Sequence, residues 1–115
     1  MSSGGHCFAG RSVSRGVVID VSPMAAVSAS SGVATVGAGA RLGRVSASLE
    51  EHGLALSAGT CPLVGMAGLT LGGGLGILGR KHGLTPDHLI GVQIVLADRQ
   101  ARHPFRASQH TIDRL

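Results

Sequence analysis

The segment GTCPLVGMAGLTLGGGLG, residues 59–76, decides how this chain folds, and nine glycines lie between positions 59 and 83. Glycine adopts backbone conformations that other residues avoid, and it lets the backbone approach a ligand or another segment closely. Because so many glycines disfavour regular structure, we expect only a short helical turn, around residues 68–71. The segment therefore predicts ligand-binding loops placed between short regular elements.

Apolar runs and turn residues indicate the elements around this segment. Residues 16–22, 33–36, 54–56 and 89–96 favour strands, whereas residues 28–32 and 84–88 are typical of turns or caps. Leu42, Val45 and Leu49 share one helical face, so a helix is expected over residues 41–52, capped by Gly53. The pattern predicts the α+β fold class, with a small mixed sheet, one main helix and glycine-rich ligand loops. We assign the domain to residues 1–98 and expect residues 99–115 to be a basic, disordered tail.

The composition excludes several classes of protein. Hydrophobic residues make up 43% of the chain and supply a core, and the 19 glycines follow no collagen period. Of the net charge of +4, residues 99–115 contribute +3 through four Arg and one Asp, which leaves +1 for the rest. Without a basic stripe or stacking aromatics, no nucleic-acid partner is expected. Neither a signal peptide nor a membrane-spanning run is evident, so we expect a soluble, cytoplasmic protein without a membrane partner.

Two nucleophilic side chains lie beside glycines. In the sequence Ser3-Gly4-Gly5-His6, consecutive backbone N–H groups of a Gly-Gly turn can form a concave nest for anions such as pyrophosphate. The imidazole of His6 and the thiolate of Cys61 are nucleophiles suited to electron-poor carbons. By residue type alone, a solvated loop histidine is the more frequent interpretation of His6, and a small buried hydrophobe is the alternative for Cys61.

The order and spacing of these motifs resemble the FAD-binding domain of the family that includes vanillyl-alcohol oxidase, p-cresol methylhydroxylase and berberine bridge enzyme (BBE). Residues 3–6 are similar to that family's first FAD loop, whose histidine joins the flavin 8α-methyl carbon. Cys61 stands where the BBE branch attaches a cysteine to flavin C6. The resemblance covers roughly residues 3–98 and implies a partial FAD-binding domain with FAD held through both His6 and Cys61. The cofactor-binding residues that it implies are Ser3, Gly4, Gly5, His6, Thr60, Cys61, Val64, Gly65, Gly68, Leu71, Gly72, Gly73, Gly74, Gly76 and Ile94.

The resemblance implies an FAD-dependent oxidoreductase that transfers hydride from a small-molecule donor of the alcohol or sugar type to covalently held FAD. The family's substrate domain lies outside these residues, so we expect a fragment that does not turn over substrate by itself. We also expect exposed apolar strand edges that make the chain prone to association or partial unfolding. Two alternatives remain open. One is a truncated, non-catalytic module that binds FAD weakly or not at all, and the other is a structural α+β domain whose glycines serve only tight turns.

Other motifs admit competing interpretations. The sequence GAGARLG, residues 37–43, imitates a dinucleotide-binding fingerprint, but its third glycine falls one place late and no acidic residue follows at the expected position. We therefore expect a strand-to-helix turn there. His52, His82 and His88 match no usual zinc spacing with Cys61, so surface or capping roles are expected for them and no metal site. A disulfide between Cys7 and Cys61 would consume the flavin nucleophile.

Overall fold

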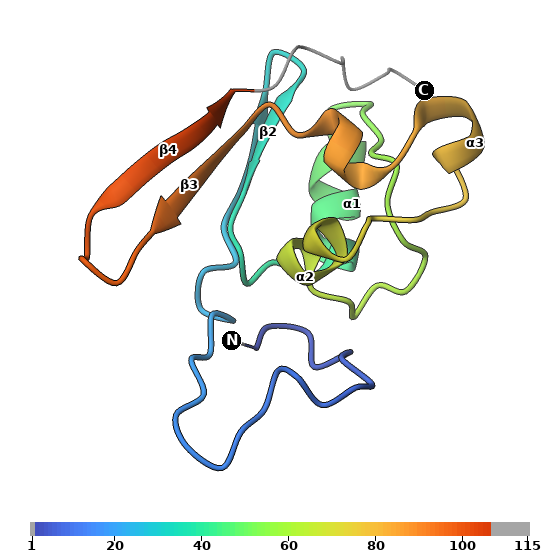
Figure 1. Ribbon diagram of the computed structural model, residues 1–115. Coiled ribbons are helices and arrows are strands. Elements are labelled where there is room, and N and C mark those ends of the chain that lie inside the picture. The colour runs from blue at the N-terminus through green and yellow to red at the C-terminus, as the bar shows by residue number, and fades with distance from the viewer. Residues whose placement is uncertain (1, 107–115) are drawn as a thin grey trace.

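The computed structural model describes residues 2–106 and has the α+β class that the sequence predicts (Figure 1). Eight short elements follow one another along the chain. In order they are β1 (Val27–Ser30), β2 (Val33–Val36), α1 (Leu42–Glu50), α2 (Met66–Leu71), α3 (Gly79–His82), the 3-10 helix η1 (Thr85–His88), β3 (Gly91–Val95) and β4 (Ala101–Arg106).

The described strands form two separate antiparallel pairs. β1 pairs with β2 so that Val27 lies opposite Val36, and the chain reverses at Ser31 and Gly32, with φ of 51° and 77°. Two successive residues of positive φ suit a tight hairpin turn. The turn predicted at residues 28–32 is therefore narrower than expected, because residues 28–30 belong to β1. The second pair, β3 with β4, projects away from the body of the molecule (Figure 1).

The core lies between α1 and the hairpin of β1 and β2. Leu42, Val45 and Leu49 are buried, as their helical spacing predicts, and Leu49 is only 1% exposed. Alternate residues of the two strands face them, since side chains of a strand point to opposite sides in turn. The buried apolar cluster consists of Ala40, Leu42, Val45, Leu49, Leu54 and Met66, with Val27, Ala29, Ala34 and Val36 among the residues packed against it.

Several boundaries predicted from the sequence are confirmed. α1 spans most of the helix expected over residues 41–52, and Gly53 follows it with φ of 64°, the left-handed conformation of a helix cap. α2 contains the helical turn predicted at residues 68–71. β2 and β3 lie within the runs that favoured strands, and η1 occupies the predicted turn or cap region.

Two predicted strands are wrong. Residues 16–22 pair only through an isolated parallel bridge between Ser2 and Asp20, and Val17 and Ile19 are 90% and 58% exposed. An apolar run forms a strand only when a neighbouring strand offers a ladder, and within residues 2–106 none does here. In the segment 54–56, Leu54 is buried in the core but no strand forms.

The expectation of a disordered basic tail also needs correction for residues 99–106. β4 pairs with β3, with Gly91 opposite Arg106 and Val95 opposite Ala101. The reversal is built by local bonds, because the Gln100 N–H donates to the Asp98 Oδ1 at 3.0 Å and Arg99 has φ of 61°. The remainder of the predicted tail, residues 107–115, lies outside the described residues. No helix within residues 2–106 is long and apolar enough to span a membrane.

Candidate functional site

The first glycine loop is anchored at its start. The Ser2 N–H donates to the Ile19 carbonyl at 2.9 Å, and the Val21 N–H donates to the Ser2 carbonyl at 3.0 Å. One residue further on, the Ser22 hydroxyl donates to the Ser3 carbonyl at 3.2 Å. These bonds hold residues 2–3 against the segment that precedes β1, so the loop that follows leaves from a fixed point.

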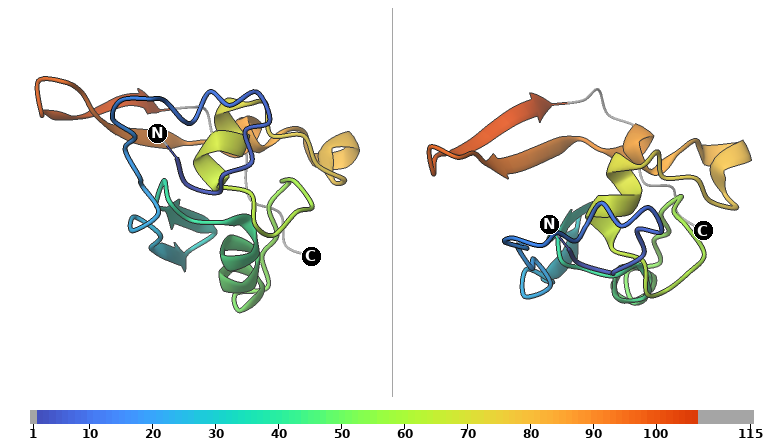
Figure 2. Two further views of the ribbon diagram at one scale, coloured as in Figure 1. Left: turned by 90° about the horizontal axis from the view of Figure 1, so that it is seen from below. Right: turned by 60° about the horizontal axis from the view of Figure 1, so that its bottom comes forward.

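The two predicted FAD loops contact each other, Gly4 lying against Gly65. A Cβ atom on Gly4 would lie 2.7 Å from the Leu63 carbonyl oxygen and closer still to the Gly65 nitrogen. A Cβ atom on Gly65 would lie 3.1 Å from the Gly4 nitrogen and would collide with the Ser3 hydroxyl. Figure 2 shows the N-terminal segment running past α2 and the loop that leads into it. Glycine at both positions therefore allows two backbones, 61 residues apart in sequence, to cross.

The start of α1 holds the second loop. The Leu42 N–H donates to the Val64 carbonyl and the Gly43 N–H to the Pro62 carbonyl, each at 2.9 Å, and the Met66 N–H donates to the Ala40 carbonyl at 2.8 Å. These first N–H groups of a helix have no partner within it and are the groups that a dinucleotide fingerprint offers to phosphate. Here Leu42 and Gly43 bind the protein itself. The interpretation of residues 37–43 as a strand-to-helix turn is confirmed.

The remaining predicted cradle glycines fall into two groups, apart from Gly72, where a Cβ atom would lie 3.1 Å from the Gly68 carbonyl oxygen. A Cβ atom on Gly5, Gly68 or Gly73 would meet nothing within 4 Å, so these residues face open space. Gly74 and Gly76 face inward instead, where a Cβ atom would collide with Thr85 and with the Ala58 carbonyl, respectively. The glycine pattern alone does not distinguish the two roles, since close approach to a ligand and close approach to the protein both select glycine.

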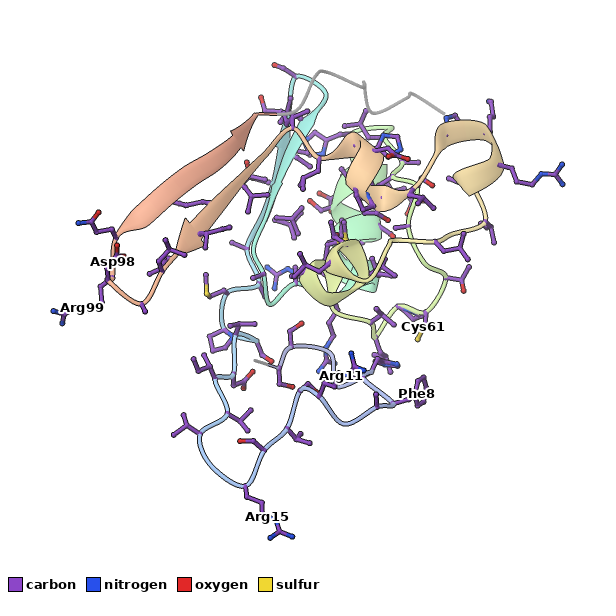
Figure 3. The ribbon with its side chains drawn as sticks, viewed as in Figure 1. Phe8, Arg11, Arg15, Cys61, Asp98 and Arg99 are labelled. Atoms are coloured by element: carbon purple, nitrogen blue, oxygen red, sulfur yellow. The ribbon has the colours of Figure 1, made fainter. Side chains whose placement is uncertain are left out.

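The two predicted attachment residues lie on accessible loops. His6 is exposed and Cys61 is half-buried, and the Cys61 carbonyl accepts a bond from the Val64 N–H at 3.2 Å, which closes a tight turn. In Figure 3 the Cys61 thiol points outward, on the side of the molecule where Phe8 and Arg11 of the N-terminal loop also lie. Among the other predicted residues, Leu71 and Ile94 are 89% and 40% exposed and Thr60 is exposed, whereas Ser3 and Val64 are half-buried.

Cys7 is a second exposed thiol beside His6. The backbone N–H group of Arg11 holds the pKa of Cys7 below its usual value. Desolvation opposes this effect, and the N–H groups of Ser12 and Ala9 and the Arg11 charge add smaller contributions that lower the pKa. Both Cys7 and Cys61 are free thiols. A thiol with a lowered pKa is reactive at lower pH, because the thiolate is the nucleophile.

We therefore expect Cys7 to be alkylated at lower pH in the folded chain than in the same chain unfolded in urea. Iodoacetamide labelling followed by mass spectrometry, repeated across pH 6–10, measures the midpoint for Cys7 in each state. The folded midpoint should lie below the unfolded one, since the N–H donors of the Cys7 loop stabilise the thiolate only when the loop is formed. Equal midpoints, or a higher folded midpoint, would show that the loop does not act on this thiol.

The zinc interpretation finds no geometric support. Within residues 2–106 no three His, Cys, Asp or Glu side chains are grouped so that they could hold a metal ion. His52 has a local role, since its Nδ1 atom lies 3.0 Å from the Ser48 carbonyl on the preceding turn of α1.

Comparison with known proteins identifies the family. Residues 1–103 match the family described as FAD binding domain. The chain belongs to this family. The domain is 53% identical over 72 residues to glucooligosaccharide oxidase of Sarocladium strictum. The aligned residues cover 62% of this chain and 14% of the relative.

Two solved structures extend the comparison. Glucooligosaccharide oxidase from Acremonium strictum, with a 6-S-cysteinyl, 8α-N1-histidyl FAD, superposes with a TM-score of 0.80 at 41% identity, over 90% of this chain and 23% of that one. The BBE-like 1 protein of Physcomitrella patens superposes with a TM-score of 0.82 at 34% identity, over 90% of this chain and 24% of that one. The chain thus spans less than a quarter of the length of each of these proteins. The family match and these similarities together place it among the FAD-binding domains of FAD-linked oxidoreductases.

The residues of this FAD-binding domain fit a dinucleotide. Within residues 2–106, no backbone hydrogen bond uses the N–H groups of Gly4, Gly5 or His6. Gly5 has φ of 69°, the conformation that turns successive N–H groups toward one side. Gly68 and Gly73 leave an open surface nearby on the second segment. The domain therefore offers free donors for a pyrophosphate beside backbone that a ligand can approach without meeting side chains.

Proposed function

We propose that this chain holds FAD covalently, through His6 to the flavin 8α-methyl carbon and through Cys61 to flavin C6, as part of an oxidoreductase acting on alcohol or sugar-type donors. The contact between Gly4 and Gly65 carries the proposal, because it joins the loop of His6 to the loop that Cys61 begins. The bicovalent FAD of the Acremonium strictum relative supports the same pair of linkages. Bound FAD would accept hydride from the donor at N5 and pass the electrons to dioxygen.

The protein's own residues supply binding and orientation. The N–H groups of Gly4, Gly5 and His6 would bind the pyrophosphate, and the open faces of Gly68 and Gly73 would lie along the ribityl chain. Each attachment replaces a C–H bond of the flavin and an N–H or S–H bond of the protein with one C–N or C–S bond. Two protons and two electrons leave in each step, and dioxygen takes them as hydrogen peroxide. His6 and Cys61 thus fix the flavin ring at two points of one edge.

We propose further that the group removing the substrate proton is supplied outside these 115 residues. The chain spans 14–24% of the relatives described above, so most of each relative has no counterpart here. The alternative of a truncated, non-catalytic module that binds FAD weakly or not at all stays open for the chain assayed alone. The third alternative, in which glycines serve only turns, accounts for Gly74 and Gly76, and for Gly73 through its positive φ, but leaves the open face of Gly68 unexplained.

Replacing Gly68 separates flavin binding from folding. Gly68 lies inside α2, and a Cβ atom there meets nothing within 4 Å, so Gly68→Ala should keep or raise stability by up to about 1 kcal/mol through helix propensity. If FAD lies over this face, Gly68→Leu should weaken FAD binding by about tenfold or more, because the side chain occupies the flavin's place. Quenching of flavin fluorescence measures reversible binding when the flavin-free chain is titrated in the absence of dioxygen, and urea unfolding measures stability.

Gly79→Leu is the matched control, since Gly79 also lies in a helix and also faces open space but stands outside the proposed site. It should leave the affinity for FAD unchanged. Equal affinities of the Gly68→Leu and Gly79→Leu variants would remove α2 from the flavin site.

A further inference from the structure

Thr85 and Ser57 form a buried polar cluster beneath the second glycine segment, and each is only 3% exposed. The Thr85 hydroxyl lies 2.7 Å from the Ser57 carbonyl and 3.0 Å from the Gly74 carbonyl. The Thr85 N–H also donates to the Gly74 carbonyl, at 3.1 Å. The Ser57 hydroxyl in turn donates to the Gly83 carbonyl at 2.6 Å. Three segments distant in sequence are thus joined at one point.

Gly74 lies flush against Thr85. It has φ of 63°, and a Cβ atom there would come within 2.5 Å of the Thr85 Cβ. The Thr85 N–H therefore holds the inner side of the glycine run at the Gly74 carbonyl, and the single hydrogen of the Thr85 hydroxyl lies between the Gly74 and Ser57 carbonyls. The adjoining Gly73, with φ of 108°, has nothing near its outer side. The glycine run 72–74 is therefore held at Gly74, which packs on Thr85, and faces open space at Gly73.

We propose that Thr85 is a positioning residue for the flavin, acting through Gly74 to hold the backbone of residues 72–73 in the conformation that receives FAD. The inference rests on the proposed function, because it takes the open side of Gly73 as part of the flavin site. Three consecutive glycines have many accessible conformations, and a bound ligand would have to select one of them. The buried bonds of Thr85 make that selection before FAD arrives, which lowers the ordering cost of binding.

The chemistry of the side chain matters here because both acceptors are buried. Valine has nearly the shape of threonine, yet it removes the one hydroxyl hydrogen that the Ser57 and Gly74 carbonyls share, and leaves Gly74 with the Thr85 N–H alone. Serine retains the hydroxyl and loses only a methyl group. The pair Thr85→Val and Thr85→Ser therefore isolates the hydrogen bonds from the packing.

The test is titration of the full flavin-free chain with FAD in the absence of dioxygen, so that covalent attachment does not proceed and binding stays reversible. Binding is followed by flavin fluorescence at a temperature where circular dichroism shows each variant folded. Thr85→Val should weaken FAD binding by about tenfold, and Thr85→Ser should restore it to within about threefold of the unmodified chain. In the flavin-free chain, hydrogen exchange at the amides of Gly73 and Gly74 should be faster in Thr85→Val than in Thr85→Ser. Exchange at the core amides of α1 should be equally fast in the two variants. A general loss of stability would instead make exchange in α1 faster in Thr85→Val as well.

Unaltered affinity or unaltered exchange at Gly73 and Gly74 in Thr85→Val would overturn the positioning role while leaving the proposed function intact. Failure of the unmodified chain to bind FAD would overturn the proposed function, and this inference with it. Should Thr85→Val not fold, Thr85→Ala replaces it, since it differs from Thr85→Ser by the hydroxyl alone, and the same two measurements decide, with the same expected directions.

Discussion

The double variant His6→Ala, Cys61→Ala should carry no flavin after denaturation, whereas the unmodified chain expressed with FAD should stay yellow on a denaturing gel. Covalent bonds survive acid and detergent, but the contacts that hold a non-covalent dinucleotide do not. Each single variant should retain flavin through the other residue, because His6 and Cys61 lie on separate loops and each has its own flavin carbon. Absorbance of the acid-precipitated protein near 450 nm measures the bound flavin.

Cys7→Ala is the matched control for this experiment. Cys7 adjoins His6 and is an exposed free thiol whose pKa is lowered by the N–H groups of its loop, so it is a rival nucleophile at the same edge of the molecule. The account expects Cys7→Ala to retain the full amount of flavin. Colour that persists in the double variant and disappears when Cys7 is also removed would move one attachment site to Cys7. Release of all flavin from the unmodified chain would reduce the proposal to non-covalent binding.

Gly4→Ala should weaken FAD binding by about 100-fold or more. The added methyl group collides with the backbone of residues 63–65, at the Gly65 nitrogen, the Leu63 carbonyl oxygen and the Val64 carbonyl carbon, and backbone atoms cannot rotate away as a side chain can. The loop of residues 3–6 must therefore move away from the second glycine segment. This movement separates the N–H groups of residues 4–6 from the open faces of Gly68 and Gly73. α1, β1 and β2 should remain folded, because they pack on one another and not on residue 4. Flavin titration and circular dichroism together distinguish these effects.

Gly16→Ala provides the comparison for Gly4→Ala. Both lie in the N-terminal segment, but a Cβ atom on Gly16 comes no closer than 3.8 Å to a neighbour, the Ser14 hydroxyl. Its affinity for FAD should equal that of the unmodified chain. If Gly4→Ala binds FAD as well as Gly16→Ala does, the crossing of the two loops is not required for the cofactor site.

The sequence predicts well those elements whose burial is periodic. Leu42, Val45 and Leu49 recur on one helical face, and α1 forms with these residues inward. The apolar run at residues 16–22 failed as a predictor because a strand needs a partner, and Val17 and Ile19 remain largely exposed. β4 was not predicted because its own residues lack an apolar period. It forms because the turn at Asp98 brings residues 101–106 beside β3, which offers a pairing partner.

The sequence predicts two glycine-rich segments, and the structure brings them into contact at Gly4 and Gly65. The glycine pattern could not separate the glycines that face open space from those that pack against the protein. Thr85 and Ser57 gave no sequence signal, because a buried hydroxyl that bonds a carbonyl 11 or 28 positions away looks like any polar residue near a turn. Such contacts become visible only when the chain is folded.

Peptide mapping of the flavin-bearing chain tests most directly whether both loops meet on one flavin. Trypsin cleavage after Arg11, Arg44 and Arg80 places His6 in the fragment 1–11 and Cys61 in the fragment 45–80. We predict a single species whose mass is that of both fragments plus one FAD, less four hydrogens, with fragmentation locating the bonds at His6 and Cys61. Two fragments that never share a flavin, or an FAD joined to neither, would contradict the account.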